Sequence, residues 1–177
     1  MNAAAAGRSA PVASAGPAAE QFLTFRVGEE LFAIPVLAVR EIRGWERVAQ
    51  IPHARAHILG VINLRGTVVP VLDVRTRFGM PPREATATTV VIVVCIDSAA
   101  GVATTVGCVV DAVSDVITIG AAEVRAAPDA CGTVERHFIR GVASLDAQLV
   151  LLLEVGLLIE AAAGATAGAT APAATGA

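Results

Sequence analysis

The sequence predicts a mostly-β fold of two similar small barrels packed together, with a short C-terminal helix and flexible Ala-rich tails. The chain contains many short apolar runs that end at glycine, proline or acidic residues, which is typical of strands joined by turns. Residues 60–74, GVINLRGTVVPVLDV, match residues 141–155, GVASLDAQLVLLLEV, at a constant spacing of 81 positions. Residues 35–42 match residues 109–116 at a spacing of 74. Two related halves predict two related barrels.

The first half of the chain predicts two hairpins. Leu23, Phe25 and Val27 alternate with polar residues, as in a half-buried strand. The expected strands are residues 22–27, 30–34, 61–64 and 68–74, with one helical turn opened by Pro35 between the hairpins. Gly66 can adopt a positive φ in the second turn, and Pro70 lacks a ladder donor, so it suits an edge or a bulge.

The second half repeats this pattern after a polar linker at residues 77–84. Its expected elements are a hairpin of residues 88–97 and 102–110, a loop over 120–136, a hairpin of 138–145 and 149–155, and a closing helix over 154–163.

Composition narrows the class of protein. The net charge is -3, tyrosine is absent and no basic stripe exists, so a nucleic-acid partner is not expected. No apolar run approaches the roughly 20 residues of a membrane span, and the N-terminus has no apolar signal core, so we expect a cytoplasmic protein without membrane insertion. Residues 1–20 and 163–177 are Ala-rich, lack large side chains and are expected to be disordered tails.

Motifs of enzymes are missing from the sequence. It has no GxSxG nucleophile motif, and because all basic residues other than histidine are arginines, it has no phosphate-binding GxxxxGK[ST] loop. We therefore expect no enzymatic activity and no cofactor.

Isolated polar residues leave one alternative class open, a small metal- or redox-binding protein. His53 and His57 would share a face if they were helical, but Pro52 precedes them and no third ligand stands out, so a solvated turn is the preferred interpretation. Asp111 and Asp115 are interpreted as surface acids on a turn. The three cysteines form no CxxC motif. Cys95 and Cys108 are interpreted as small core residues, and Cys131 is not assigned a role.

The segment GVINLRGTVVPVLDVRTRFG closely resembles the signature of the CheW-like domain of chemotaxis coupling proteins. The segments FLTFRVGEELFAIPVLAVREIRGWERVAQIP, VVDAVSDVI and FIRGVA are similar to other parts of that family, so the resemblance implies one CheW-like domain over residues 21–162. It further implies two five-stranded SH3-like barrels, interleaved in the chain. The implied function is a non-enzymatic adaptor between the cytoplasmic tip of a chemoreceptor and the regulatory domain of a histidine kinase, at membrane-associated receptor arrays.

By this resemblance, four residues form the receptor site: Val36, Val39, Glu41 and Arg65. The kinase-binding residues are unknown. Two other interpretations stay open, a surface ion pair for Glu41 and Arg65 worth about 0–1 kcal/mol, and core positions for the valines. Asn63 is expected to secure the turn. Arg55, His57 and Trp45 depart from the family's usual residues, which leaves open a coupling protein of a related chemosensory pathway, such as one for surface motility.

Overall fold

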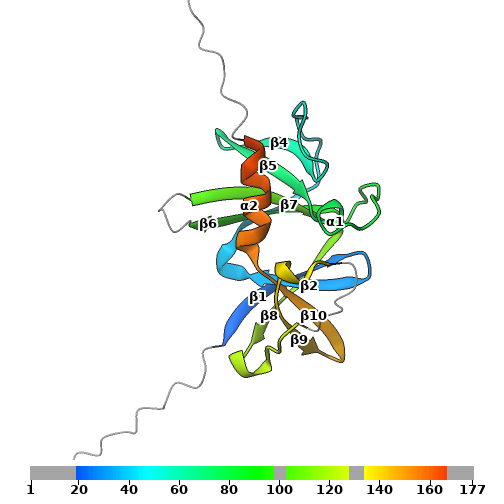
Figure 1. Ribbon diagram of the computed structural model, residues 1–177, viewed down its shortest axis with the longest axis vertical. Helices are drawn as coiled ribbons and strands as arrows, with labels where there is room; N and C mark the ends of the chain where they lie inside the picture. The colour runs from blue at the N-terminus through cyan, green and yellow to red at the C-terminus, as the bar shows by residue number, and fades with distance from the viewer. Residues whose placement is uncertain (1–18, 98–102, 128–133, 167–177) are drawn as a thin grey trace, which may run out of the picture.

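Two five-stranded sheets make up the computed structural model, which describes residues 19–97, 103–127 and 134–166. One sheet has the order β8 (Ala112–Ile119), β1 (Glu20–Val27), β2 (Glu30–Pro35), β10 (Gln148–Leu153) and β9 (Ile139–Leu145). The other has the order β3 (Val39–Gly44), β6 (Val90–Asp97), β7 (Ala103–Val110), β5 (Thr67–Asp73) and β4 (Ile58–Leu64). We call them the terminal barrel and the central barrel, and Figure 1 shows them stacked along the long axis. The predicted fold class is confirmed.

The internal repeat reappears as two equivalent sets of strands. The β4–β5 hairpin matches the β9–β10 hairpin, and each pairs in parallel with the second strand of another hairpin, β5 with β7 and β10 with β2. Each repeat unit gives its first hairpin to one barrel and its last three strands to the other. The sheets of both barrels are therefore built from both halves of the chain.

One hydrophobic core runs through both barrels. Phe25 and Phe32 of the terminal barrel stack with centroids 5.9 Å apart. Phe32 lies 5.3 Å from Phe78, which follows β5, and Phe78 lies 5.7 Å from Phe138. Because this aromatic row joins the two barrels, relative movement of the barrels would break contacts inside the core.

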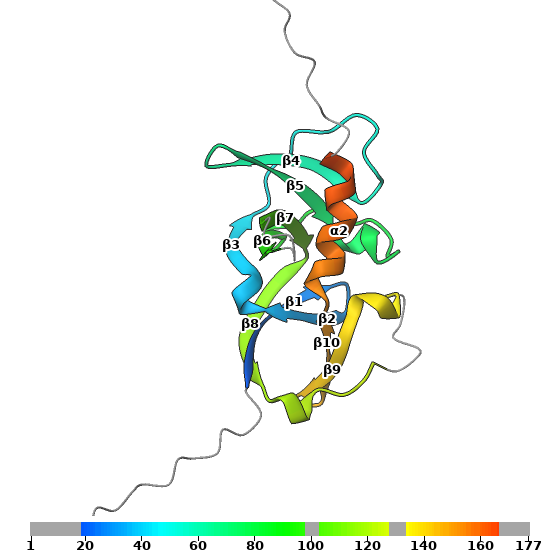
Figure 2. The same ribbon diagram turned by 60° about the vertical axis from the view of Figure 1, so that its left-hand side comes forward.

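Short helices close the ends of the barrels. Helix α2 (Val155–Thr166) leaves β10 of the terminal barrel, yet it packs on β5, β6 and β7 of the central barrel (Figure 2). Its residues Leu158 and Ile159 are buried in the shared core. The remaining helical segments are α1 (Val74–Arg77), η1 (Val36–Ala38), η2 (Ala121–Glu123) and η3 (Arg136–Phe138).

The boundaries differ from the prediction around β4 and β5. β4 begins at Ile58, three residues before the predicted start, and Val74 opens helix α1 instead of ending a strand. The Asp73 side chain accepts a hydrogen bond from the Arg75 amide at 3.0 Å, which caps this helix. Pro70 lies on an inner strand, which the edge interpretation did not foresee; it is tolerated because the β5–β7 ladder starts only at Val71.

Some expectations fall outside the described residues. Most of the two predicted tails lies there, and so does Cys131. In the part of the chain that the structure describes, no helix is long and apolar enough to cross a membrane.

Candidate protein-interaction site

The tip of the β4–β5 hairpin presents Arg65 to solvent. Arg65 and Gly66 have φ values of 50° and 89°, so both central residues of the turn are left-handed, as a tight hairpin requires. The Asn63 Oδ1 atom accepts a hydrogen bond from the Gly66 amide at 2.7 Å. The expected roles of Gly66 and Asn63 in the turn are thus confirmed, and the Arg65 side chain is left 87% exposed.

Glu41 on β3 is held by two arginines. The Arg65 guanidinium lies 3.4 Å from one carboxylate oxygen of Glu41, and Arg43 Nε lies 3.8 Å from the other. Arg43 in turn donates to Glu46 at 2.8 Å. The predicted ion pair between Glu41 and Arg65 exists, but with Arg65 so exposed it contributes little to stability. The pair leaves most of the Arg65 side chain free for a partner.

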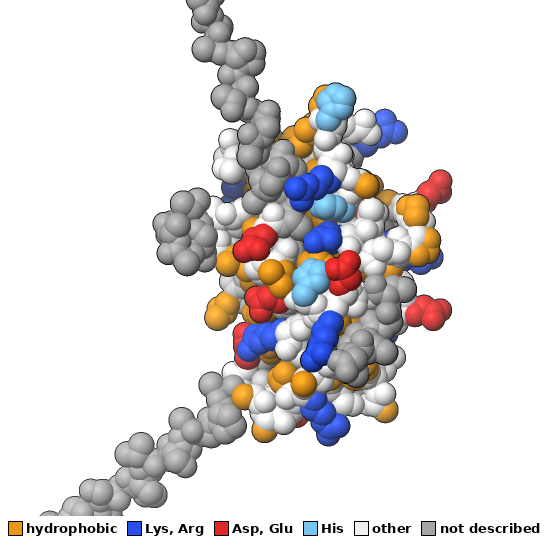
Figure 3. Space-filling model, in the orientation of Figure 1, with side chains coloured by type: hydrophobic (Ala, Val, Ile, Leu, Met, Phe, Trp, Pro, Cys, Tyr) orange, Lys and Arg blue, Asp and Glu red, His pale blue; other side chains and the backbone are white. Residues whose placement is uncertain are grey.

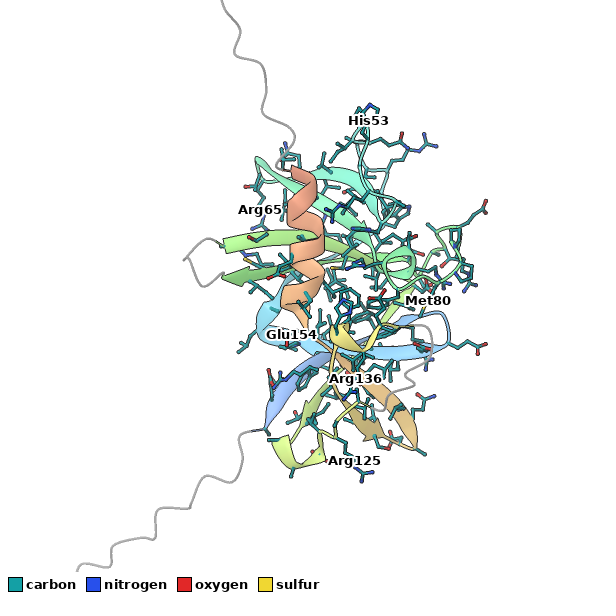
Figure 4. The ribbon with its side chains drawn as sticks, viewed as in Figure 1. His53, Arg65, Met80, Arg125, Arg136 and Glu154 are labelled. Carbon is teal, nitrogen blue, oxygen red and sulfur yellow. The ribbon has the colours of Figure 1, made fainter. Side chains whose placement is uncertain are left out.

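A shallow hollow of about 520 Å³ lies beside this ion pair. Its residues come from β3, the β4–β5 hairpin and β7: Arg40, Glu41, Leu64, Arg65, Thr67, Val69 and Thr105. Figure 4 shows Arg65 at the free end of its hairpin, with Arg125 far away on the terminal barrel. An open hollow with a charged rim suits the side chains of a protein partner better than it would enclose a small molecule.

Val36 and Val39 do not line the hollow. Both are half-buried and pack against the core shared by the barrels. Between them Leu37 is 96% exposed, the most exposed large apolar side chain of the described residues. Leu37 was missed because a sequence pattern cannot tell which face of a three-residue 3₁₀ turn points outward. An apolar residue left in water this fully is a possible contact for a partner.

A second polar cluster joins the two barrels, and no pattern in the sequence indicated it. Arg75, whose side chain is only 11% exposed, forms a short ion pair with Asp111. The same Asp111 oxygen accepts from the Gly28 amide of the β1–β2 turn at 2.7 Å. Asp111 does lie at a bend, but its side chain is only 26% exposed and compensates a buried guanidinium, so the interpretation as a surface acid is incomplete. Asp115 is exposed, and its backbone amide and carbonyl bond to the Thr24 hydroxyl at 3.0 and 2.8 Å.

The residues that suggested a metal or redox protein are scattered. His53 and His57 lie in a region of turns instead of on one helix face. Among the described residues, no group of three or more His, Cys, Asp or Glu side chains could hold a metal ion. Cys108 is buried, as expected, and burial raises the pKa of its thiol to about 12; Cys95 is only half-buried.

Charges on the surface are mixed in sign. On the face drawn in Figure 3, acidic, basic and apolar side chains are interspersed over both barrels. Two fused β-barrels with an open, charged hollow at a hairpin tip define a protein-binding module.

Comparisons with known proteins identify the family of this module. Residues 21–163 match the model of the CheW-like domain. The chain is 42% identical over 135 residues to the chemotaxis protein CheW of Rhizobium meliloti, which covers 76% of this chain and 84% of that protein. It is 35% identical over 140 residues to the chemotaxis protein CheW of Klebsiella aerogenes, covering 79% of this chain and 81% of that protein. The crystal structure of the scaffolding protein TtCheW from Thermoanaerobacter tengcongensis superposes with a TM-score of 0.69 at 28% identity, covering 84% of this chain and 91% of that one.

The chain therefore belongs to the CheW-like domain family, whose members act as scaffolds in chemotaxis. This confirms the resemblance found in the sequence.

Proposed function

We propose that this protein is a cytoplasmic adaptor that couples chemoreceptors to a chemotaxis-type histidine kinase at membrane-associated arrays. The receptor's cytoplasmic tip binds at the hollow of the central barrel, and the kinase binds through its regulatory domain of the same fold. The observation that carries the proposal is the accessible Arg65 at the tip of a tight hairpin, beside Glu41, whose carboxylate lies 3.4 Å from Arg65 and 3.8 Å from Arg43.

The four proposed receptor-site residues have different roles. Glu41 and Arg65 supply charges of opposite sign, which set the orientation of a bound helical tip. Val36 and Val39 hold the turn between β2 and β3 against the core, and this turn presents the apolar side chain of Leu37. A helix with an apolar stripe and polar flanks can contact both kinds of group at once.

Coupling by such an adaptor requires that its binding free energy differs between the two states of the receptor. The adaptor performs no chemistry, and it transmits a change only if its partners bind it differently in their two states. The shared core and the Arg75–Asp111 ion pair make the two barrels one rigid body, so a displacement at one barrel is carried to the other.

The test is binding calorimetry with purified full-length protein, using a chemoreceptor cytoplasmic fragment and the kinase regulatory domain encoded in the same genome. We expect the wild type to bind both, and Arg65→Glu to lose about tenfold or more in affinity for the receptor fragment alone. Arg125→Glu, the same substitution on the terminal barrel, should leave receptor binding unchanged, and circular dichroism checks the fold of each variant. A wild-type protein that binds neither partner refutes the proposal.

A further inference from the structure

A β-bulge in β3 gives the hollow a second arginine. Along the β3–β6 ladder, Val39 pairs with Val94 and Glu41 pairs with Val93, so Arg40 is an extra residue without a partner on β6. In a regular strand, neighbouring side chains point to opposite faces. Arg40 and Glu41 nevertheless both line the hollow, because a bulge redirects the extra side chain.

The charges around the hollow leave Arg40 available to a partner. Glu41 is already engaged by Arg65 and Arg43, whereas Arg40 is exposed and forms no ion pair with any residue in the described ranges. The other lining residues, from Leu64, Thr67 and Val69 to Thr105, carry no charge. Two guanidinium groups therefore face one carboxylate, and the hollow has an excess of one positive charge.

We propose that Arg40 is a specificity-determining residue of this site, which selects a partner segment that presents a carboxylate to it. Guanidinium groups bind carboxylates through two parallel hydrogen bonds, which fixes orientation as well as charge. The half-buried, apolar Leu64 on the same wall suits the apolar side chains next to that carboxylate. The inference rests on the proposed function, since the segment it assigns is an acidic stretch of the receptor's cytoplasmic tip.

The test compares Arg40→Glu, Arg40→Gln and the control Arg47→Glu in calorimetric titrations with the receptor cytoplasmic fragment. Arg47 is an exposed arginine close in sequence that does not line the hollow. We expect Arg40→Glu to weaken binding about tenfold and Arg40→Gln about threefold, with no change for Arg47→Glu. The dependence of affinity on salt should become shallower for Arg40→Gln, because one charge contact is lost.

A charge exchange identifies the partner group. Replacing acidic residues of the receptor tip one at a time by lysine should reveal one position that restores binding to Arg40→Glu. If both Arg40 variants bind like the wild type while Arg65→Glu is weakened, the inference about Arg40 is overturned and the proposed function stands. If the wild type does not bind the fragment at all, the proposed function falls and this inference falls with it.

Discussion

A substitution at Gly60 tests how much the stability of the central barrel depends on the backbone bridge between Ala49 and Val61. Val61 forms an isolated bridge with Ala49, with backbone hydrogen bonds of 3.0 and 2.8 Å. A Cβ atom on Gly60 would lie 2.8 Å from the carbonyl carbon of Ala49 and closer still to its oxygen, and the φ of 153° is nearly exclusive to glycine. The substitution Gly60→Ala must therefore displace the segment that closes the barrel.

The stability lost on Gly60→Ala can be estimated from these contacts. Two backbone hydrogen bonds contribute about 1 kcal/mol each, and the unfavourable φ adds about 1–3 kcal/mol, so the free energy of unfolding should fall by about 3–5 kcal/mol. Domains are commonly stable by only about 5–15 kcal/mol. With a urea slope of about 2 kcal/mol/M, the unfolding midpoint should fall by about 2 M. The single tryptophan, Trp45, packs against the apolar cluster of Ile62, Val69 and Val71 in the central barrel, so its fluorescence reports the unfolding transition.

The repeat supplies a second test and the fold a control. Gly141 is the equivalent of Gly60 beside the bridge of Arg125 with Val142, and an added Cβ there would lie 2.6 Å from a Val124 methyl group. Gly141→Ala should also destabilise, by about 2–3 kcal/mol from the bridge and the clash. Gly44→Ala has open space and should change stability by less than about 0.5 kcal/mol. A Gly60→Ala variant as stable as Gly44→Ala would refute the reasoning.

Four further predictions concern single side chains. Ala147→Gly should stabilise by about 0.5–1 kcal/mol in urea unfolding, because alanine at a φ of 67° is strained, although glycine raises the entropy of the unfolded chain. Asp111→Ala should lower the free energy of unfolding by about 3 kcal/mol, because it leaves the buried Arg75 uncompensated. The double variant Asp111→Ala with Arg75→Met should regain part of that stability, and an equal loss in the single and the double variant would contradict this explanation. The Cys108 thiol should resist iodoacetamide at pH 8 until the protein unfolds, as peptide mass spectrometry can show. Burial raises the pKa of this thiol from 9.0 to about 12, so the free energy of unfolding should fall as the pH rises from 9 to 12. Burial raises the pKa of Glu30 above 4.5, so ionisation of this carboxyl opposes folding at neutral pH. Glu30→Gln should therefore raise the thermal midpoint at pH 7 relative to wild type, and this gain should shrink below pH 4.5. A gain that is the same at both pH values would exclude ionisation as its cause.

The sequence predicted the local elements well because their signals are local. The strand over residues 22–27, the turn at Gly66 and the side-chain bond of Asn63 each depend on neighbours in the chain, and all three are found. The strand is not half-buried as predicted, however, because Thr24 is buried together with Phe22, Leu23 and Phe25. The match between residues 60–74 and 141–155 also predicted two related barrels, since equal patterns of apolar residues and turns specify equal hairpins.

Long-range pairing was beyond the sequence pattern. Asp111 and Arg75 are 36 positions apart and meet because β5 and β7 pair in parallel, with Asp73 opposite Val109. The repeat showed that two units exist, but it could not show that they exchange strands. The site was predicted in part: Glu41 and Arg65 do meet, whereas Arg40 enters the hollow through a bulge that leaves no mark in the alternation of residues.

The exchange of strands between repeat units has a consequence for how the two ends of the molecule can differ. One unit alone would need a second identical copy to complete its barrels, and a symmetric dimer must display the same residue at both hairpin tips. In a single chain the two tips are encoded separately. One therefore carries Arg65 and the other Asp146, with Val68 and Leu149 exposed beside them. Duplication within one chain thus allows opposite ends of one rigid body to be fitted to different partners, which a scaffold needs and a symmetric dimer cannot provide.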